Sequence, residues 1–272
     1  IALPLVLGVT FLASPVLMAT ENWDDHDRSE KYTALALGRA YLDSLDPNAI
    51  IFTIADDSFP LWYLQEVEGY RTDVRVVCTT LLDAEWYIDQ MKIKAYESEP
   101  LKIRFEHKQY IGNKLAGAII TSSIKERFEL DTIMDFIASD RPETKIEINS
   151  QNKVVRIPTN KFSLPVDKAK VLKNGTVSQK FVNDIVSEIP IDVHATQLSR
   201  KHIIIYDIIA GNKWDRPIYF VSTDVSDPSL LWMKDYLQLN GLVYKLVPIK
   251  AEIEENGNPY DIGTIDSEKM YK

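Results

Sequence analysis

The first twenty residues of the chain carry no charged side chain, and this run limits the possible folds more than any other feature. A spanning helix needs about 20 mostly apolar residues, so residues 1–20 are predicted to be the end of a membrane-embedded helix. The chain opens on Ile1 without a basic segment, unlike a signal peptide, so we expect it to be cut from a longer protein. A buried hydrophobic helix and a signal-peptide remnant remain the alternatives.

The segment after this run indicates on which side of the membrane the rest of the chain lies. Trp23 suits the membrane interface, where an amphipathic ring is favoured. Cytoplasmic flanks are usually rich in Lys and Arg, whereas this flank is acidic and has only Arg28 and Lys31 nearby. Residues 21–272 are therefore predicted to be a soluble domain on the extracytoplasmic, periplasmic side of a membrane.

Composition excludes some classes of function. The net charge is −9, whereas a nucleic-acid binder needs a basic face to neutralise phosphates, so we expect no nucleic-acid partner. Cys78 is the one cysteine, and no cysteine–histidine pattern indicates zinc. Hydrophobic residues at 45% and charged residues at 26% are typical of a globular domain.

Apolar runs alternate with helical segments in the soluble part. Residues 49–54 and 74–79 are predicted strands, and the helix between them, from Pro60 to Glu68, completes a unit of the βαβ kind. The predicted elements near the C-terminus are a helix over residues 198–210 closed by Gly211, a strand over 218–222, a helix over 230–239 and a strand over 242–247. We expect an α/β fold with one mainly parallel sheet and flanking helices.

The middle of the chain, about residues 100–195, is interpreted as an irregular, β-rich insertion on this α/β core. Residues 130–138 are a predicted helix. Residues 145–149 and 153–157 alternate polar and apolar side chains around a polar turn, which predicts a hairpin. The string Asn174-Gly175-Thr176 fits either an N-glycosylation acceptor or a plain turn.

Two acidic loops follow predicted strands. The candidate ligand-binding residues are Asp56, Asp57 and Ser58 in one loop and Asp224 and Asp227 in the other. The carboxyl ends of parallel strands share one edge of a sheet, where ligands bind, so these side chains are expected together. Such carboxylates suit a divalent cation or sugar hydroxyls. The competing interpretation is helix N-capping.

A further candidate site is the dense cluster of Asp24, Asp25, His26, Asp27 and Arg28. Carboxylates beside an imidazole suit metal binding or acid–base work, although the spacing matches no known ligand motif. A linker held by local salt bridges is the competing interpretation. The chain shows no phosphate-binding glycine loop and no nucleophile elbow, so we predict no catalytic residue in it.

Several Trp-rich strings resemble a bacterial polytopic membrane-protein family catalogued as domain of unknown function 2723. The strings are NWDDHDRS (residues 22–29), FPLWY (59–63), QEVEG (65–69), WYIDQM (86–91), WDRPIYF (214–220) and YLQL (236–239). The family's acidic loop reads Gly-Asp-Asn-Asp-Thr, whereas this chain has Ala55 before its two aspartates and lacks the glycine.

The resemblance implies a parent similar to membrane glycosyltransferases of the protein O-mannosyltransferase type, which use lipid-linked sugar donors. Their catalytic carboxylate lies between early membrane helices, and no residue here corresponds to it. The first hypothesis is therefore a domain that binds an acceptor protein or glycan for such a transferase. The alternatives are a non-enzymatic binding or assembly module of the envelope and a metal-dependent hydrolase. The residues identify no cofactor beyond a candidate divalent cation.

Overall fold

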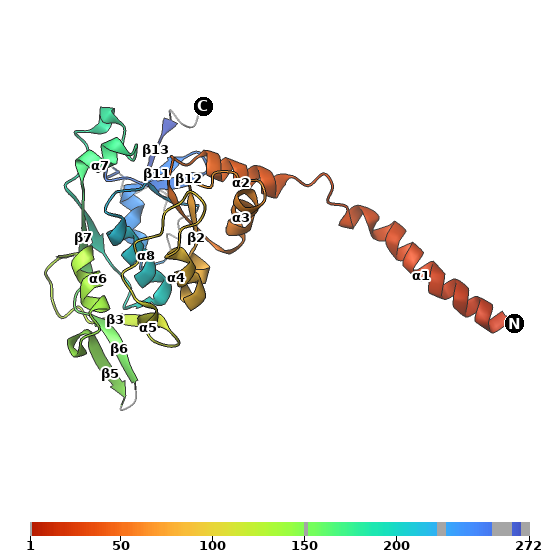
Figure 1. Ribbon diagram of the computed structural model, residues 1–272, viewed down its shortest axis with the longest axis horizontal. Helices are drawn as coiled ribbons and strands as arrows, with labels where there is room; N and C mark the ends of the chain where they lie inside the picture. Colours follow the sequence, from red (N-terminus) through yellow and green to blue (C-terminus); the bar gives the residue numbers. More distant parts are fainter. Residues whose placement is uncertain (1, 150–151, 222–226, 252–262, 268–272) are drawn as a thin grey trace, which may run out of the picture. The chain divides into compact units, whose positions relative to one another are not determined.

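The structure is a computed structural model that describes residues 2–149, 152–221, 227–251 and 263–267. The chain divides into two compact units, Ile1–Ala36 and Leu37–Lys272. The described α-helices are α1 (Ala2–His26), α2 (Thr33–Asp43), α3 (Ser58–Glu66), α4 (Glu85–Met91), α5 (His107–Tyr110), α6 (Leu130–Ala138), α7 (Lys168–Lys173) and α8 (Arg200–Asn212) (Figure 1). Short 3-10 helices are η1 (Ala55–Asp57), η2 (Thr79–Asp83), η3 (Pro142–Thr144), η4 (Gln179–Phe181) and η5 (Leu231–Tyr236).

The strands in the described part of the chain form three sheets. They are β1 (Ile50–Thr53), β2 (Arg75–Cys78), β3 (Gly117–Ile120), β4 (Phe128–Glu129), β5 (Lys145–Asn149), β6 (Asn152–Ile157), β7 (Lys161–Pro165), β8 (Glu188–Asp192), β9 (Gln197–Ser199), β10 (Ile218–Phe220), β11 (Leu237–Asn240), β12 (Val243–Leu246) and β13 (Thr264–Ile265). The sheets have the orders β13-β11-β12-β10-β1-β2, β5-β6-β3-β9 and β4-β7-β8.

The first unit consists mainly of α1, which occupies the uncharged run and continues into the acidic segment. Its described large apolar side chains are exposed: Phe11, Leu12, Val16, Leu17 and Met18. The sequence predicts a membrane-embedded helix over residues 1–20. In the described part of the chain, no helix combines the length and the apolar character that crossing a membrane requires.

The four strands that the sequence predicts for one sheet are all in the six-stranded sheet, as β1, β2, β10 and β12. The prediction of a mainly parallel sheet is wrong, because the sheet is mixed. β1 pairs in parallel with β2 and β10, whereas β12 is antiparallel to both β10 and β11.

The reason for the mixed sheet is a hairpin in place of a predicted helix. The segment expected to be helical over residues 230–239 forms η5 and then strand β11. Gly241 and Leu242 connect Asn240 to its antiparallel partner Val243, and Gly241 has φ +64°. A two-residue loop with a left-handed glycine favours a hairpin, so this glycine turns the chain back instead of closing a helix.

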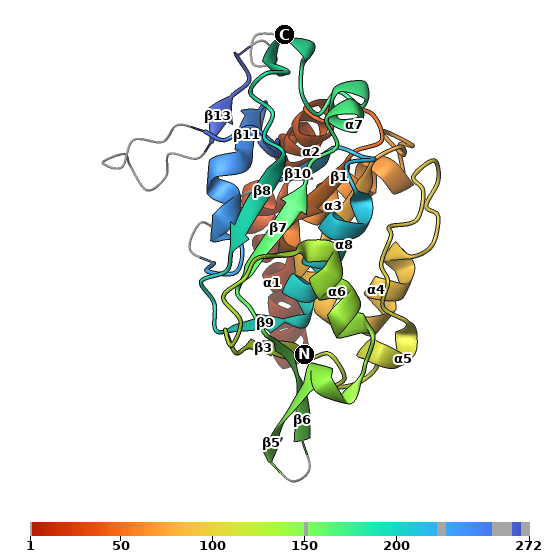
Figure 2. The same cartoon turned by 90° about the vertical axis from the view of Figure 1, so that its left-hand side faces the viewer.

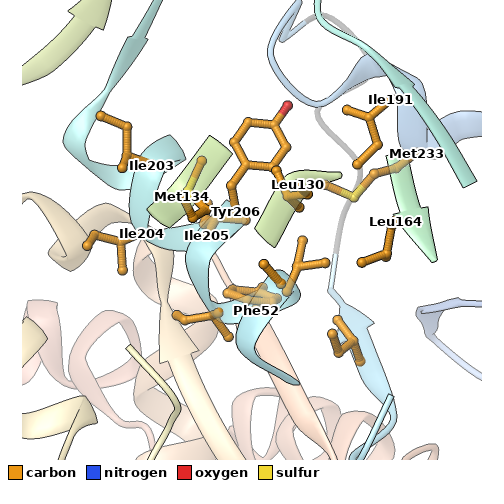
Figure 3. Close-up of a cluster of buried hydrophobic side chains, with 14 of the residues drawn as sticks. Phe52, Leu130, Met134, Leu164, Ile191, Ile203, Ile204, Ile205, Tyr206 and Met233 are labelled. Carbon is orange, nitrogen blue, oxygen red and sulfur yellow. The ribbon is translucent and has the colours of Figure 1, made fainter. Parts of the chain in front are cut away.

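Helix α8 is the centre of the core. Nearly all its side chains are buried, and Figure 3 shows Ile203, Ile204, Ile205 and Tyr206 among side chains from β1, α6, β7 and β8. The helix continues to Asn212, so Gly211 does not close it as predicted. A Cβ on Gly211 would lie 2.4 Å from the Lys102 carbonyl oxygen, so close approach of that segment requires a glycine there.

The six-stranded sheet is covered on both faces. Ile50 and Phe52 of β1 belong to the core cluster around α8, whereas Ile51, Leu61 and Leu64 are buried outside that cluster. Figures 1 and 2 accordingly show α8 on one face of the sheet and α3 on the other. The predicted hairpin of the middle region is confirmed as the antiparallel pair β5 and β6, and the predicted helix is α6.

Candidate functional site

The site lies where three parallel strands end. β10, β1 and β2 run in the same direction, with Phe220, Phe52 and Val77 in register, so their carboxyl ends share one edge of the sheet. The 3-10 helices η1 and η2 continue from β1 and β2, and they contact each other. The predicted common edge is therefore present. Asp224, in the loop after β10, lies outside the described residues.

Asp56 and Asp57 lie on η1 at this edge. Asp56 is exposed and Asp57 half-buried. Asp57 is at the N-cap position of α3, but its side chain makes no capping hydrogen bond, so N-capping does not account for it. Burial raises the pKa of the Asp57 carboxyl, and the neighbouring charge of Asp56 raises it further.

The backbone at this loop is strained. Ala55 has φ +42°, in the left-handed region that non-glycine residues rarely adopt. Such a conformation costs on the order of 1–3 kcal/mol and is common at binding sites. The strained residue directly precedes the two aspartates.

Ser58, the third candidate in this loop, lies inside the fold. Its side chain is fully buried, and its Oγ lies 2.6 Å from Thr53 Oγ1. Thr53 also donates to the Val77 carbonyl, and Thr79 Oγ1 donates to the Thr53 carbonyl at 2.9 Å. These hydroxyl groups tie the ends of β1 and β2 together beneath the acidic loop.

A row of aromatic rings lies beside the acidic loop, and sequence reasoning did not assign it to the site. The aromatic row consists of Phe59 and Trp62 of α3 and Trp86 and Tyr87 of α4. Successive ring centroids are 5.8 Å apart for Phe59 and Trp62, 6.4 Å for Trp62 and Tyr87, and 5.6 Å for Tyr87 and Trp86. The two rings at the ends of the row are exposed to solvent: Phe59 is 58% exposed and Trp86 is 60% exposed.

The aromatic row is fixed to the sheet edge at both ends. Phe59 follows Asp57 by two residues, in the first turn of α3. The buried Tyr87 hydroxyl accepts the Cys78 N–H at 2.8 Å, which attaches α4 to the end of β2. The signal in the sequence is the Trp-rich strings at residues 59–63 and 86–91. Only the tertiary structure shows that their rings pack against one another.

Asp227 is held inside the fold. Its Oδ2 lies 2.8 Å from His202 Nε2, and its Oδ1 accepts the Ser229 N–H at 2.9 Å. Burial opposes ionisation of Asp227, but the bonds from Ser229 and His202 outweigh it and lower the pKa of this carboxyl. Asp227 therefore joins helix α8 to the loop before η5, and its two oxygens already have partners.

The predicted cluster at residues 24–28 spans the end of α1 and the turn after it. His26 Nδ1 lies 2.9 Å from the Asn22 carbonyl oxygen, and Asp27 Oδ1 accepts the Ser29 N–H at 2.9 Å. Hydrogen bonding to Ser29 lowers the pKa of the Asp27 carboxyl. Asp24 and Arg28 are exposed, and the side chain of Asp25 lies outside the described residues.

Metal binding was one option for the acidic groups. Among the residues that the structure describes, no three His, Cys, Asp or Glu side chains come together in a group that would hold a metal ion.

Comparison with known families identifies a family for this chain. A family model described as TMEM260-associated domain 2 matches residues 34–269, which is most of the chain. No curated protein and no solved structure matches it.

Proposed function

Since the chain belongs to the TMEM260-associated domain 2 family, we propose that it is the acceptor-binding domain of a membrane glycosyltransferase-like protein. In this proposal the domain lies on the extracytoplasmic side and binds an acceptor protein or its glycan. The parent protein then transfers a sugar from a lipid-linked donor. The association of the family with a membrane protein and the resemblance to O-mannosyltransferase-like enzymes support this proposal.

The observation that carries the proposal is the aromatic row beside two carboxylates. The faces of exposed aromatic rings stack on the apolar C–H face of a sugar ring, and carboxylate oxygens accept its hydroxyl groups. Phe59 and Trp86 supply open rings, and Asp56 and Asp57 supply the acceptors at one end of the row. This pairing of flat apolar groups with acceptors suits a glycan chain laid along the sheet edge.

The proposed contribution to transfer is positioning. Holding the acceptor next to the reacting sugar lowers the entropic part of the barrier, and it needs no acid or base in this domain. The exposed apolar side chains of α1 are consistent with a neighbouring membrane or protein surface.

The test compares glycan binding by variants of the full chain. The probes are neutral oligosaccharides of mannose, glucose or N-acetylglucosamine, and the readouts are Trp fluorescence and NMR saturation transfer. Trp86→Ala is expected to raise the dissociation constant about tenfold. This corresponds to a loss of roughly 1.4 kcal/mol of binding free energy. The double change Asp56→Asn and Asp57→Asn is expected to weaken binding while leaving the fold intact.

Trp23→Ala is the matched control, because Trp23 is as exposed as Trp86 but lies on α1. Its affinity for the probes is expected to stay at the wild-type value. Equal affinities of the Trp86 and Trp23 variants would contradict the proposal, as would no binding of any probe at millimolar concentration.

A second candidate function is an assembly module. Phe59, Tyr63 and Val67 are exposed at four-residue intervals along α3 and the residue after it, which makes an apolar stripe suited to a protein partner. Val67→Ser separates the two functions, because Val67 lies outside the aromatic row. Loss of a protein complex with glycan binding unchanged would favour assembly.

A further inference from the structure

A cavity lies far from the aromatic row in the sequence and is lined by other elements. Its volume is about 300 Å³, and the turn after α7, helix η4 and strands β11 and β12 line it. None of its lining residues belongs to α3 or α4. A water molecule occupies about 30 Å³ in the liquid, so this cavity has room for a larger guest.

An unsatisfied hydroxyl group lines the cavity. Thr176 is 2% exposed, and its Oγ1 has no hydrogen-bond partner among the residues that the structure describes. Leaving a buried polar group unpaired costs about 1–3 kcal/mol, and native proteins rarely accept that cost without a reason. A ligand that bonds to this hydroxyl would supply the missing partner.

The local sequence holds this hydroxyl in place. Asn174 Oδ1 accepts the Thr176 N–H at 2.9 Å, and Asn174 Nδ2 donates to the Trp214 carbonyl at 2.8 Å. The glycosylation-like string is therefore a closed turn with its asparagine amide already bonded. Gly175, with φ +77°, completes the turn and brings Thr176 to the cavity wall.

The cavity lining also includes a buried ammonium group. Lys245 is 3% exposed, and its Nζ donates to Asp46 Oδ2 at 2.5 Å and to the Gly175 carbonyl at 2.6 Å. The positive charge is thus balanced within the fold, and Lys180 and Asp266 add one charge of each sign to the lining. A lining without excess positive charge favours a neutral ligand rich in hydroxyl groups over an anion.

The remaining wall is apolar. Val247 is buried, Phe181 is 38% exposed, and both line the cavity. A pyranose ring matches this lining, because it has an apolar C–H face and hydroxyl groups around its edge. Small-molecule sites of this size, at about 300 Å³ and above, combine mostly apolar walls with a few placed polar groups.

We propose that this cavity binds a single neutral pyranose unit. Thr176 Oγ1 bonds to one sugar hydroxyl, Gln238 offers its amide oxygen to another, and Phe181 packs against the C–H face. The proposal does not depend on the aromatic row, so each site is testable without the other.

The test is saturation-transfer NMR on the full chain with mannose, glucose, galactose and N-acetylglucosamine, and with inorganic phosphate as the anionic probe. At least one sugar is expected to bind. Thr176→Val, which keeps the side-chain shape but removes the hydroxyl, is expected to weaken that binding about tenfold. Phe181→Ala, at a partly exposed position that should tolerate truncation, is the second variant and is expected to weaken it as well.

Trp23→Ala is the control, because Trp23 lies outside both the cavity and the aromatic row. Its monosaccharide affinity should equal that of the wild type. Monosaccharide binding that Trp86→Ala abolishes and Thr176→Val leaves unchanged would assign the binding to the aromatic row. Phosphate binding in place of sugar binding would overturn the proposal. So would sugar binding that neither Thr176→Val nor Phe181→Ala weakens.

Discussion

At the scale of single residues, His202 shows how burial sets a protonation state. Its side chain is 8% exposed and is bonded on both nitrogens. The Asp227 carboxylate only accepts, so Nε2 donates to it, and Nδ1 is left to accept from Ser199. Burial lowers the pKa of His202 below its usual 6.5, although the charge of Asp227 opposes this shift. His202 is therefore neutral in the folded chain.

This state predicts a loss of stability on acidification. In the unfolded chain His202 takes up a proton as the pH falls through 6.5, while the folded chain resists it, so the free energy of unfolding falls below that pH. His202→Gln is expected to flatten this fall, measured by urea denaturation at pH 7 and pH 5.5. His194→Gln, at an exposed position, is the control. A pH dependence equal in both variants would contradict the prediction.

At the scale of elements, the sequence predicted those helices and strands whose structure depends on neighbouring residues in the chain. The bounds of α6 and the hairpin of β5 and β6 follow from periodicity and turn residues, and the apolar strands β1, β2, β10 and β12 follow from continuous β-branched runs. The strand β11 was missed, because its sequence fits a helix and only the turn at Gly241 makes it a strand. The same limit applies to Ser58 and Asp227, whose partners Thr53 and His202 are brought to them by folding.

Helix α8 provides a prediction at this scale. Alanine normally stabilises a helix interior relative to glycine by about 1 kcal/mol. At Gly211 the added Cβ would lie 2.4 Å from the Lys102 carbonyl oxygen, so that segment must move. We expect Gly211→Ala to lower the free energy of unfolding by about 1–3 kcal/mol, as overpacking does, measured by chemical denaturation. Gly8→Ala, in α1 with no atom within 4 Å, is the control and should cause no loss.

At the scale of the whole molecule, the interpretation of residues 100–195 as an insertion bears on how the chain unfolds. One continuous core cluster includes Phe52 and Phe220 of the six-stranded sheet together with Ile133, Phe162 and Ile189 of the middle region. Helix α8 contacts α6, β3 and η2, so it links the sheets from the inside. The middle region therefore shares its core with the α/β sheet, and the second unit should unfold as one cooperative structure.

Phe162→Ala tests this cooperativity. The ring is fully buried and meets the Tyr206 ring edge to face at 6.0 Å between centroids. Truncating a buried phenylalanine costs about 3–5 kcal/mol. If the core is continuous, the loss destabilises the six-stranded sheet and the middle region equally. Far-UV circular dichroism, and hydrogen exchange at β1 amides, should then shift to lower denaturant by the same amount as exchange at β7 amides. Loss of protection at β7 with β1 unchanged would show that the middle region unfolds by itself.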